Sequence, residues 1–199
     1  MSRLATRQPA GGPAVFFDKD GTLVRDVPYN VRPELIEWLP GVFEALGTLH
    51  DAGFRLVVVT NQSGVAHGRF TERELDRYLA AFTDELADAG VTLDAVVYCP
   101  HHPEGRLSRY RRFCACRKPN PGMLASAAAR LAIDTPRSWM IGDLLDDVEA
   151  GARAGTFTVL LGVHDDQRPP ESGLRRPDIV AYSVTEAADA ILRHSMAVA

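Results

Sequence analysis

Six short apolar segments alternate along this chain with segments of helical character, and this alternation constrains the fold more than any other feature. It is typical of parallel sheets whose strands are joined by crossover helices. We therefore predict an α/β fold, a Rossmann-like parallel sheet flanked by helices. The predicted strands are 14–17, 55–60, 95–99, 138–141, 157–161 and, more weakly, 178–180.

Helix start and stop signals delimit the segments between these strands. Thr71 and Glu74 form a capping-box pattern at the start of segment 72–89, and Gly90 follows its end. Comparable start and stop signals predict the other helices. The predicted helices are 41–51, 72–89, 122–132, 144–154 and 185–195.

Composition describes an ordinary globular chain, with 46% hydrophobic and 24% charged residues among 199. We expect a flexible tail over 1–12 and a single domain over 13–199.

The net charge of −4 gives no general reason to expect nucleic acid or an anionic membrane as a partner. No apolar run is long enough to span a bilayer, and the N-terminus lacks the apolar region of a secretory signal. We expect a cytoplasmic monomer.

Two acids, Asp18 and Asp20, directly follow the predicted strand 14–17. Side chains two residues apart in an extended segment point the same way, so both acids should face one spot. Carboxylates this close repel each other unless a proton or a cation lies between them. Gly21 permits the sharp turn that follows. Taken alone, the pattern also fits a loop that carries two acids.

Polar residues follow two further strands. Thr60-Asn-Gln-Ser-Gly comes after the second strand, and Gly142-Asp143 after the fourth. In open parallel sheets, ligands bind beyond the carboxyl ends of the strands. Each of these residues could instead be a cap or a turn residue, the commoner fate of Asp, Ser and Thr after a strand. Their joint placement predicts a ligand site at this edge.

Four ordered motifs resemble those of the haloacid dehalogenase-like (HAD-like) phosphatases, and the match spans most of the chain. The motifs are Asp18–Thr22, Val59–Asn61, Lys118 and Met140–Asp147. The resemblance implies that Asp18 attacks phosphorus and becomes an aspartyl-phosphate. It also implies that Asp20 protonates the leaving oxygen and then deprotonates water.

The residue chemistry supports these roles independently, because a carboxylate can approach an anionic phosphate only if charge is neutralised around both. Mg²⁺ seeks oxygen ligands, and Asp18, Asp143 and the backbone carbonyl of Asp20 suit it. Lys118 and Thr60 can donate to the phosphoryl oxygens. Lys118 is one of only two lysines, Lys19 being the other, in a chain with 20 arginines. A retained lysine indicates a need for a compact ammonium group.

All three cysteines lie in the irregular segment 99–118, together with two histidines. An odd, clustered set in a presumed cytosolic chain favours a metal over disulfides. Three thiolates and one imidazole make a closed tetrahedral set of the kind that holds structural zinc. His101 repeats the two-residue spacing of the Cys-x-Cys pair, so we prefer it to His102. The predicted zinc ligands are Cys99, His101, Cys114 and Cys116; the alternative is three cysteines packed as small hydrophobes.

The same cysteine segment, together with Thr60–Ala66, resembles a narrower group, the heptose 1,7-bisphosphate 7-phosphatases. This resemblance implies a phosphorylated sugar as substrate, D-glycero-D-manno-heptose 1,7-bisphosphate, cleaved at its 7-phosphate. His67 lies where the group commonly has Arg, and Leu144 where it often has Lys, so contacts to the distal part of the substrate stay open. The implied substrate contacts are Asp26, Val27, Pro28, Tyr29, Thr60, Asn61, Gln62, Ser63, Arg117 and Lys118.

Three alternatives stand beside this interpretation. A histidinol-phosphate phosphatase would share the cysteine segment, with a shorter loop. A polynucleotide 3′-phosphatase would need a basic, aromatic track, and only the 106–118 loop is basic. A zinc-stapled binding module would show no turnover at all. Four further arginines of the loop could form an anion-binding rim or simply be solvated, namely Arg106, Arg109, Arg111 and Arg112.

Overall fold

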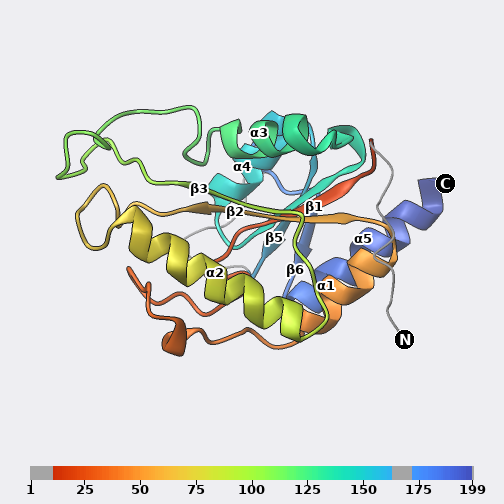
Figure 1. Ribbon diagram of the computed structural model, residues 1–199. Coiled ribbons are helices and arrows are strands. Elements are labelled where there is room, and N and C mark those ends of the chain that lie inside the picture. Colours follow the sequence, from red (N-terminus) through yellow and green to blue (C-terminus); the bar gives the residue numbers. More distant parts are fainter. Residues whose placement is uncertain (1–10, 163–171, 199) are drawn as a thin grey trace.

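A computed structural model describes residues 11–162 and 172–198 and contains a sheet of six parallel strands (Figure 1). The predicted fold class is therefore confirmed. The tail predicted over 1–12 falls mostly outside the described residues. The strands are β1 (Ala14–Phe17), β2 (Arg55–Asn61), β3 (Ala95–Cys99), β4 (Trp139–Gly142), β5 (Phe157–Leu161) and β6 (Ile179–Ala181).

Helices cover both faces of the sheet, with α3 and α4 on one face and α1, α2 and α5 on the other (Figure 1). The predicted capping box is present, because Glu74 N–H donates to Thr71 Oγ1 and Thr71 N–H donates to the Glu74 carboxylate. The α-helices are α1 (Val42–Asp51), α2 (Glu72–Asp88), α3 (Gly122–Leu131), α4 (Leu145–Ala154) and α5 (Val184–Val198), with short 3₁₀ turns at Pro33–Leu35 and Thr135–Arg137.

The central strands are buried on both faces, which explains why they read as continuous apolar runs. Phe17 and Val58 pack into the cluster beneath α1 and α5, whereas Phe16 and Val57 pack into the cluster beneath α3. These two apolar layers fix the position and register of β1 and β2 in the sheet. Their carboxyl ends are therefore held rigidly at one edge of the sheet.

The strand order, β3-β2-β1-β4-β5-β6, reverses direction at β1. The chain moves outward from β1 to β3 and returns to β4 on the other side of β1. Crevices at such reversal points are where open α/β sheets bind ligands. The backbone N–H of Asp18 donates to the carbonyl of Ile141 at 2.9 Å, so the end of β1 is tied to β4 at this point.

The long segment between β3 and α3 contains no strand or helix and extends beyond the carboxyl edge of the sheet (green in Figure 1). It carries Cys114 and Cys116, follows Cys99 at the end of β3, and contains Lys118 near its own end. Among the helices of the described chain, none is both long and apolar enough to cross a lipid bilayer.

Candidate active site

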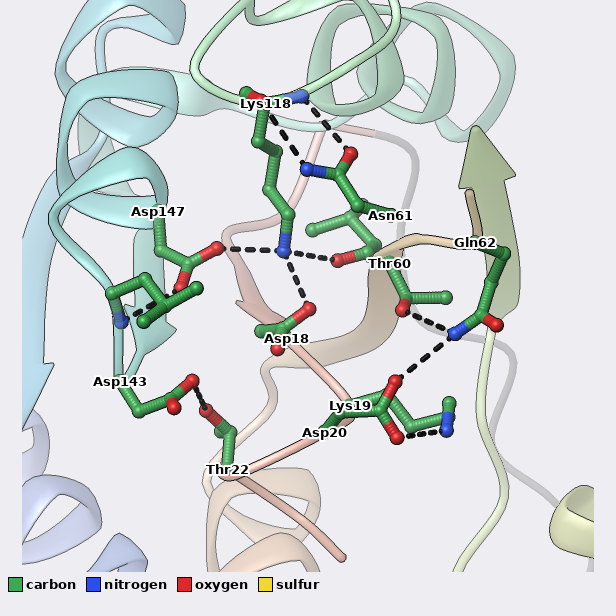
Figure 2. Close-up of polar contacts among 12 residues, drawn as sticks. Asp18, Lys19, Asp20, Thr22, Thr60, Asn61, Gln62, Lys118, Asp143 and Asp147 are labelled. Atoms are coloured by element: carbon green, nitrogen blue, oxygen red, sulfur yellow. Dashed lines mark hydrogen bonds and ion pairs between the residues drawn. The ribbon is translucent and has the colours of Figure 1, made fainter. Parts of the chain in front are cut away.

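Lys118 is the centre of the polar cluster at the end of β1 and β2 (Figure 2). Its ammonium contacts Asp18 Oδ1 at 2.5 Å, Asp147 Oδ1 at 2.6 Å and the Val59 carbonyl at 2.9 Å. An ammonium has three N–H donors, and here each has an acceptor. Only 3% of Lys118 is exposed, so the group is fixed in position as well as in charge.

The neighbouring charges decide the protonation of this cluster. Burial by itself lowers the pKa of Lys118, but the Asp147 and Asp18 carboxylates outweigh it and hold the pKa above its ordinary value. Burial, opposed by Lys118 and reinforced by Asp147, raises the pKa of Asp18 to about 8. Burial, then Asp147, raises the pKa of Asp143 to about 6. The acids are therefore crowded, and more positive charge would stabilise their ionised forms.

Asn61 sets the backbone that carries Lys118. Its side-chain amide donates to the Lys118 carbonyl at 3.2 Å and accepts from the Lys118 N–H at 3.1 Å. This two-way bond joins the end of β2 to a residue 57 positions later in the chain. Asn61 was predicted as a substrate contact, which stays a prediction; the structure adds that its amide holds the backbone of the lysine.

Three carboxylates lie within 4.8 Å of one another and could hold a metal ion, those of Asp18, Asp143 and Asp147. Their oxygens are the hard donors that Mg²⁺ prefers, and the raised pKa values of Asp18 and Asp143 indicate a site that a cation would relieve. Asp147 is the member that our sequence prediction omitted. Its position four residues after Asp143, in the first turn of α4, is the signal that could have identified it.

Asp20 lies apart from this acidic cluster. Its carboxylate contacts the Lys19 ammonium and accepts from Gln62 Nε2 at 3.0 Å (Figure 2). Asp18 and Asp20 both line one cleft, which agrees with the expectation that they face one spot. Their carboxylates nevertheless have different partners, because β1 ends at Phe17 and strand alternation does not continue through Asp20. The predicted metal contact from the backbone carbonyl of Asp20 involves a different atom and stays a prediction.

A cleft of about 380 Å³ opens above these groups. Every predicted substrate-contacting residue lines it, and so do Asn30, Leu144 and Asp146, which were not predicted as contacts. Of the five arginines in the basic loop, Arg117 lines the described cleft. The other four lie outside it and are exposed, which favours a solvated loop, and Arg112 also contacts the His101 ring. The His67 ring lies tilted against that of His102, with 4.8 Å between the ring centroids, and His67 does not line the described cleft.

The four predicted zinc ligands form a second cluster. Their sulfur atoms are separated by 3.5 Å (Cys99–Cys114), 3.1 Å (Cys99–Cys116) and 3.2 Å (Cys114–Cys116). His101 Nδ1 lies 3.4 Å from the Cys116 sulfur. Zn–S bonds of about 2.3 Å place two sulfurs of a tetrahedron about 3.8 Å apart, so the cluster nearly has the required size.

The surroundings of the imidazole in this cluster favour the form that binds metals. Burial, followed by the Arg112 guanidinium, lowers the pKa of His101, which favours the neutral ring. Neutral imidazole is the ligand form of histidine. His102, the alternative we ranked second, lies outside the four-residue cluster.

Comparison with known proteins identifies the family. Residues 115–187 match a family model described as HAD-hydrolase-like. The D-glycero-beta-D-manno-heptose-1,7-bisphosphate 7-phosphatase of Salmonella typhi is 46% identical over 149 residues, which cover 75% of this chain and 79% of that protein.

Two solved structures extend the similarity to the fold. A HAD-like phosphatase from Mesorhizobium loti has a TM-score of 0.82 and 34% identity, covering 96% of this chain and 90% of the other. The D,D-heptose 1,7-bisphosphate phosphatase from B. bronchiseptica, solved with magnesium and phosphate, has a TM-score of 0.77 and 30% identity, covering 92% of this chain and 99% of the other. The chain therefore belongs to the HAD-like hydrolase family, resembles its heptose bisphosphate phosphatases, and is a phosphomonoester hydrolase.

Proposed function

We propose that this enzyme removes the 7-phosphate of D-glycero-D-manno-heptose 1,7-bisphosphate in a Mg²⁺-dependent reaction that passes through an aspartyl-phosphate. The names of its relatives support the substrate, and the magnesium in the B. bronchiseptica structure supports the metal. The observation that carries the mechanism is Asp18, which lies in the cleft with its carboxylate against the Lys118 ammonium. A nucleophilic carboxylate is thereby held next to a fixed positive charge.

The residues that would hold Mg²⁺ are Asp18, Asp143 and the backbone carbonyl of Asp20. When bound, the ion supplies positive charge that lets an anionic carboxylate and an anionic phosphate approach each other. Asp147 has a different task in this proposal. Its carboxylate accepts from the Leu144 N–H at 3.1 Å and from Lys118, so it orients the lysine from the start of α4.

In the first half of the reaction, an oxygen of Asp18 forms a bond to phosphorus while the bond between phosphorus and the sugar oxygen breaks. The carboxyl proton of Asp20 passes to that sugar oxygen, which leaves as an alcohol. As Asp18 bonds to phosphorus, the Lys118 N–H that contacts the free Asp18 carboxylate is released to donate to the transferred phosphoryl group. Thr60 accepts from Gln62 at 3.0 Å, so its own hydroxyl proton can be donated to the same group.

In the second half, a water oxygen bonds to phosphorus while the bond between phosphorus and Asp18 breaks. The Asp20 carboxylate takes the water proton. Inorganic phosphate leaves, and Asp18 and Asp20 return to their starting states.

The sugar and its second phosphate would lie along the wall of the cleft formed by 26–29 and Arg117. Arg117 also donates to the His101 carbonyl at 3.4 Å, so its position depends on the cysteine loop. Leu144, 44% exposed, lines the same cleft and adds no charge. Arg117 is therefore the cation we expect to face the second phosphate.

Specificity constants on a panel of phosphate esters test the substrate. We expect kcat/KM for the heptose bisphosphate to exceed the values for histidinol phosphate and for a 3′-phosphorylated oligonucleotide. A preference of more than about tenfold for either competitor, roughly 1.4 kcal/mol in transition-state binding, would reject the sugar assignment. Absence of turnover on all three esters, with zinc and Mg²⁺ present, would reject the assignment of this enzyme to the phosphatases of all three substrates.

We further propose that the cysteine cluster binds zinc and holds the loop rather than performing chemistry, because all four ligand positions come from the protein.

We also expect the enzyme to be a cytoplasmic monomer. Light scattering coupled to size-exclusion chromatography tests the monomer, and fractionation of the source cells tests the compartment.

A further inference from the structure

Lys19 is a buried cation between the two mechanistic acids, and the proposed reaction makes no use of it. Only 1% of the residue is exposed. A fully buried lysine is rare and needs partners that compensate its charge. Its ammonium pairs with the Asp20 carboxylate, donates to the Tyr78 hydroxyl at 3.4 Å, and lies 4.9 Å from the centroid of the Tyr78 ring.

These contacts hold the Asp20 carboxylate from two directions (Figure 2). Oδ1 contacts Lys19, and Oδ2 accepts from Gln62 Nε2 at 3.0 Å. A carboxylate with one donor can still rotate, whereas separate donors on both oxygens fix its plane. The Asp20 side chain remains 30% exposed, so the fixed group still opens to the cleft.

Tyr78 connects this arrangement to the core. It comes from α2, is 2% exposed, and packs in an apolar cluster with Leu75 and Leu79. The cation therefore rests on a rigid helix on the side of Asp20 away from the acidic cluster of Asp18, Asp143 and Asp147. Asp20 is held out of that cluster and over the cleft.

We propose that Lys19 is a positioning residue for the phosphatase reaction, holding the Asp20 carboxylate where it can protonate the leaving oxygen. The inference rests on the proposed function, in which Asp20 is the general acid. Lys19 acts through Asp20 and does not contact the substrate. A role in stability alone would not distinguish between substrates, whereas a role in proton transfer depends on the leaving group.

The test compares two leaving groups in Lys19→Met. An alkyl alcohol needs a proton to leave, whereas the p-nitrophenolate of p-nitrophenyl phosphate leaves without one. The constant kcat/KM reports the steps through Asp18 phosphorylation, where the general acid acts. We expect kcat/KM to fall about 100-fold for the best alkyl phosphate of the panel and less than about threefold for p-nitrophenyl phosphate. Lys19→Arg, which keeps a cationic donor, should recover part of the loss.

Asp20→Asn is the reference that separates the two hypotheses. If Asp20→Asn shows the selective loss and Lys19→Met lowers both substrates equally or neither, Lys19 does not position the acid and the proposed function stands. If Asp20→Asn shows no selectivity, the general-acid role in the proposed function is wrong. Tyr78→Phe removes one support of Lys19 and should show a smaller selective loss. If Lys19→Met does not fold, Tyr78→Phe replaces it as the test variant. Equal losses of kcat/KM for the alkyl phosphate and for p-nitrophenyl phosphate in Tyr78→Phe would then overturn the inference.

Discussion

At the scale of single residues, the site depends on how many donors and acceptors each group offers. Lys118 uses all three N–H groups on three acceptors from different parts of the chain. Asp18 has no comparable compensation, because Lys118 is its one cationic partner among the described contacts. This difference predicts how each residue tolerates substitution.

Asp18→Asn should abolish turnover and leave the fold intact. The change removes the nucleophile and one magnesium ligand but little volume, so we expect activity to fall by at least about 10⁴-fold. The melting temperature should stay the same or rise, because burial already disfavours the ionised acid. Phosphate release and thermal melting check this. Substantial turnover in the purified variant would rule out the covalent mechanism.

Lys118→Arg should be damaging although it keeps the charge. A planar guanidinium cannot direct three donors at Asp18, Asp147 and the Val59 carbonyl in the space of an ammonium. We expect kcat to fall roughly 100-fold, the scale of losing one transition-state donor. Arg130→Lys, at an exposed position on α3, is the matched control and should be neutral. Near wild-type kcat in Lys118→Arg would show that the ammonium shape is incidental.

At the scale of elements, the site is formed where the turn after β1 meets the start of α4. Gly21 has φ +79°, and a Cβ there would lie 2.2 Å from Asp143 Oδ2. Gly142 is similarly close, since its Cβ would lie 2.3 Å from atoms of the Asp147 side chain. Gly21 therefore lets Asp143 approach the turn after β1, and Gly142 lets the Asp147 side chain pack against the end of β4.

Gly21→Ala should weaken magnesium activation beyond its effect on stability. Gly155 has the same φ of +79°, and a Cβ at that position would have nothing within 4 Å, so Gly155→Ala carries the backbone strain alone. Both variants should lose about 1–2 kcal/mol of stability from the left-handed backbone. Only Gly21→Ala should raise the Mg²⁺ concentration for half-maximal activity, by at least about tenfold. Equal magnesium requirements in the two variants would contradict this placement of Asp143.

At the scale of the whole molecule, the reversal of strand order at β1 and the cysteine loop bring two candidate metal sites to one edge of the sheet. The cluster of three cysteines and His101 immediately precedes Arg117 and Lys118, so the loop that it holds together carries two cleft residues. Magnesium and zinc should therefore contribute separately, one to activity and the other to stability.

The two metals should separate on purification. Zinc in a closed thiolate site binds with on the order of 10–16 kcal/mol in small zinc modules, so it should persist, whereas Mg²⁺ should dialyse away and restore activity when returned. Cys114→Ser and Cys116→Ser should lower the melting temperature by at least about 6 °C, roughly 2 kcal/mol for a chain of this size. Ser108→Ala, in the same loop, is the control. Elemental analysis without zinc in protein with reduced thiols would reject the site.

Local sequence was sufficient to predict most elements. The strands and helices begin and end within a few residues of the predicted positions, because buried parallel strands are apolar throughout and helix caps are local signals. The cluster of Cys99, His101, Cys114 and Cys116 was also predictable, since all four residues lie within 18 positions and their spacing repeats. The last helix continues to Val198, beyond the predicted end at 195, where no stop signal occurs.

Tertiary structure decided the arrangement of the charged groups. Asp147 reaches Lys118, 29 residues earlier, and Asn61 holds the same lysine across 57 residues. No local pattern encodes such pairs, because they depend on which strand ends the sheet brings together. Asp20 likewise accepts from Gln62, 42 residues later, although its other partner, Lys19, is its neighbour in the chain. The sequence by itself determined the residue types and the elements that carry them, and packing around the reversed strand order determined their partners.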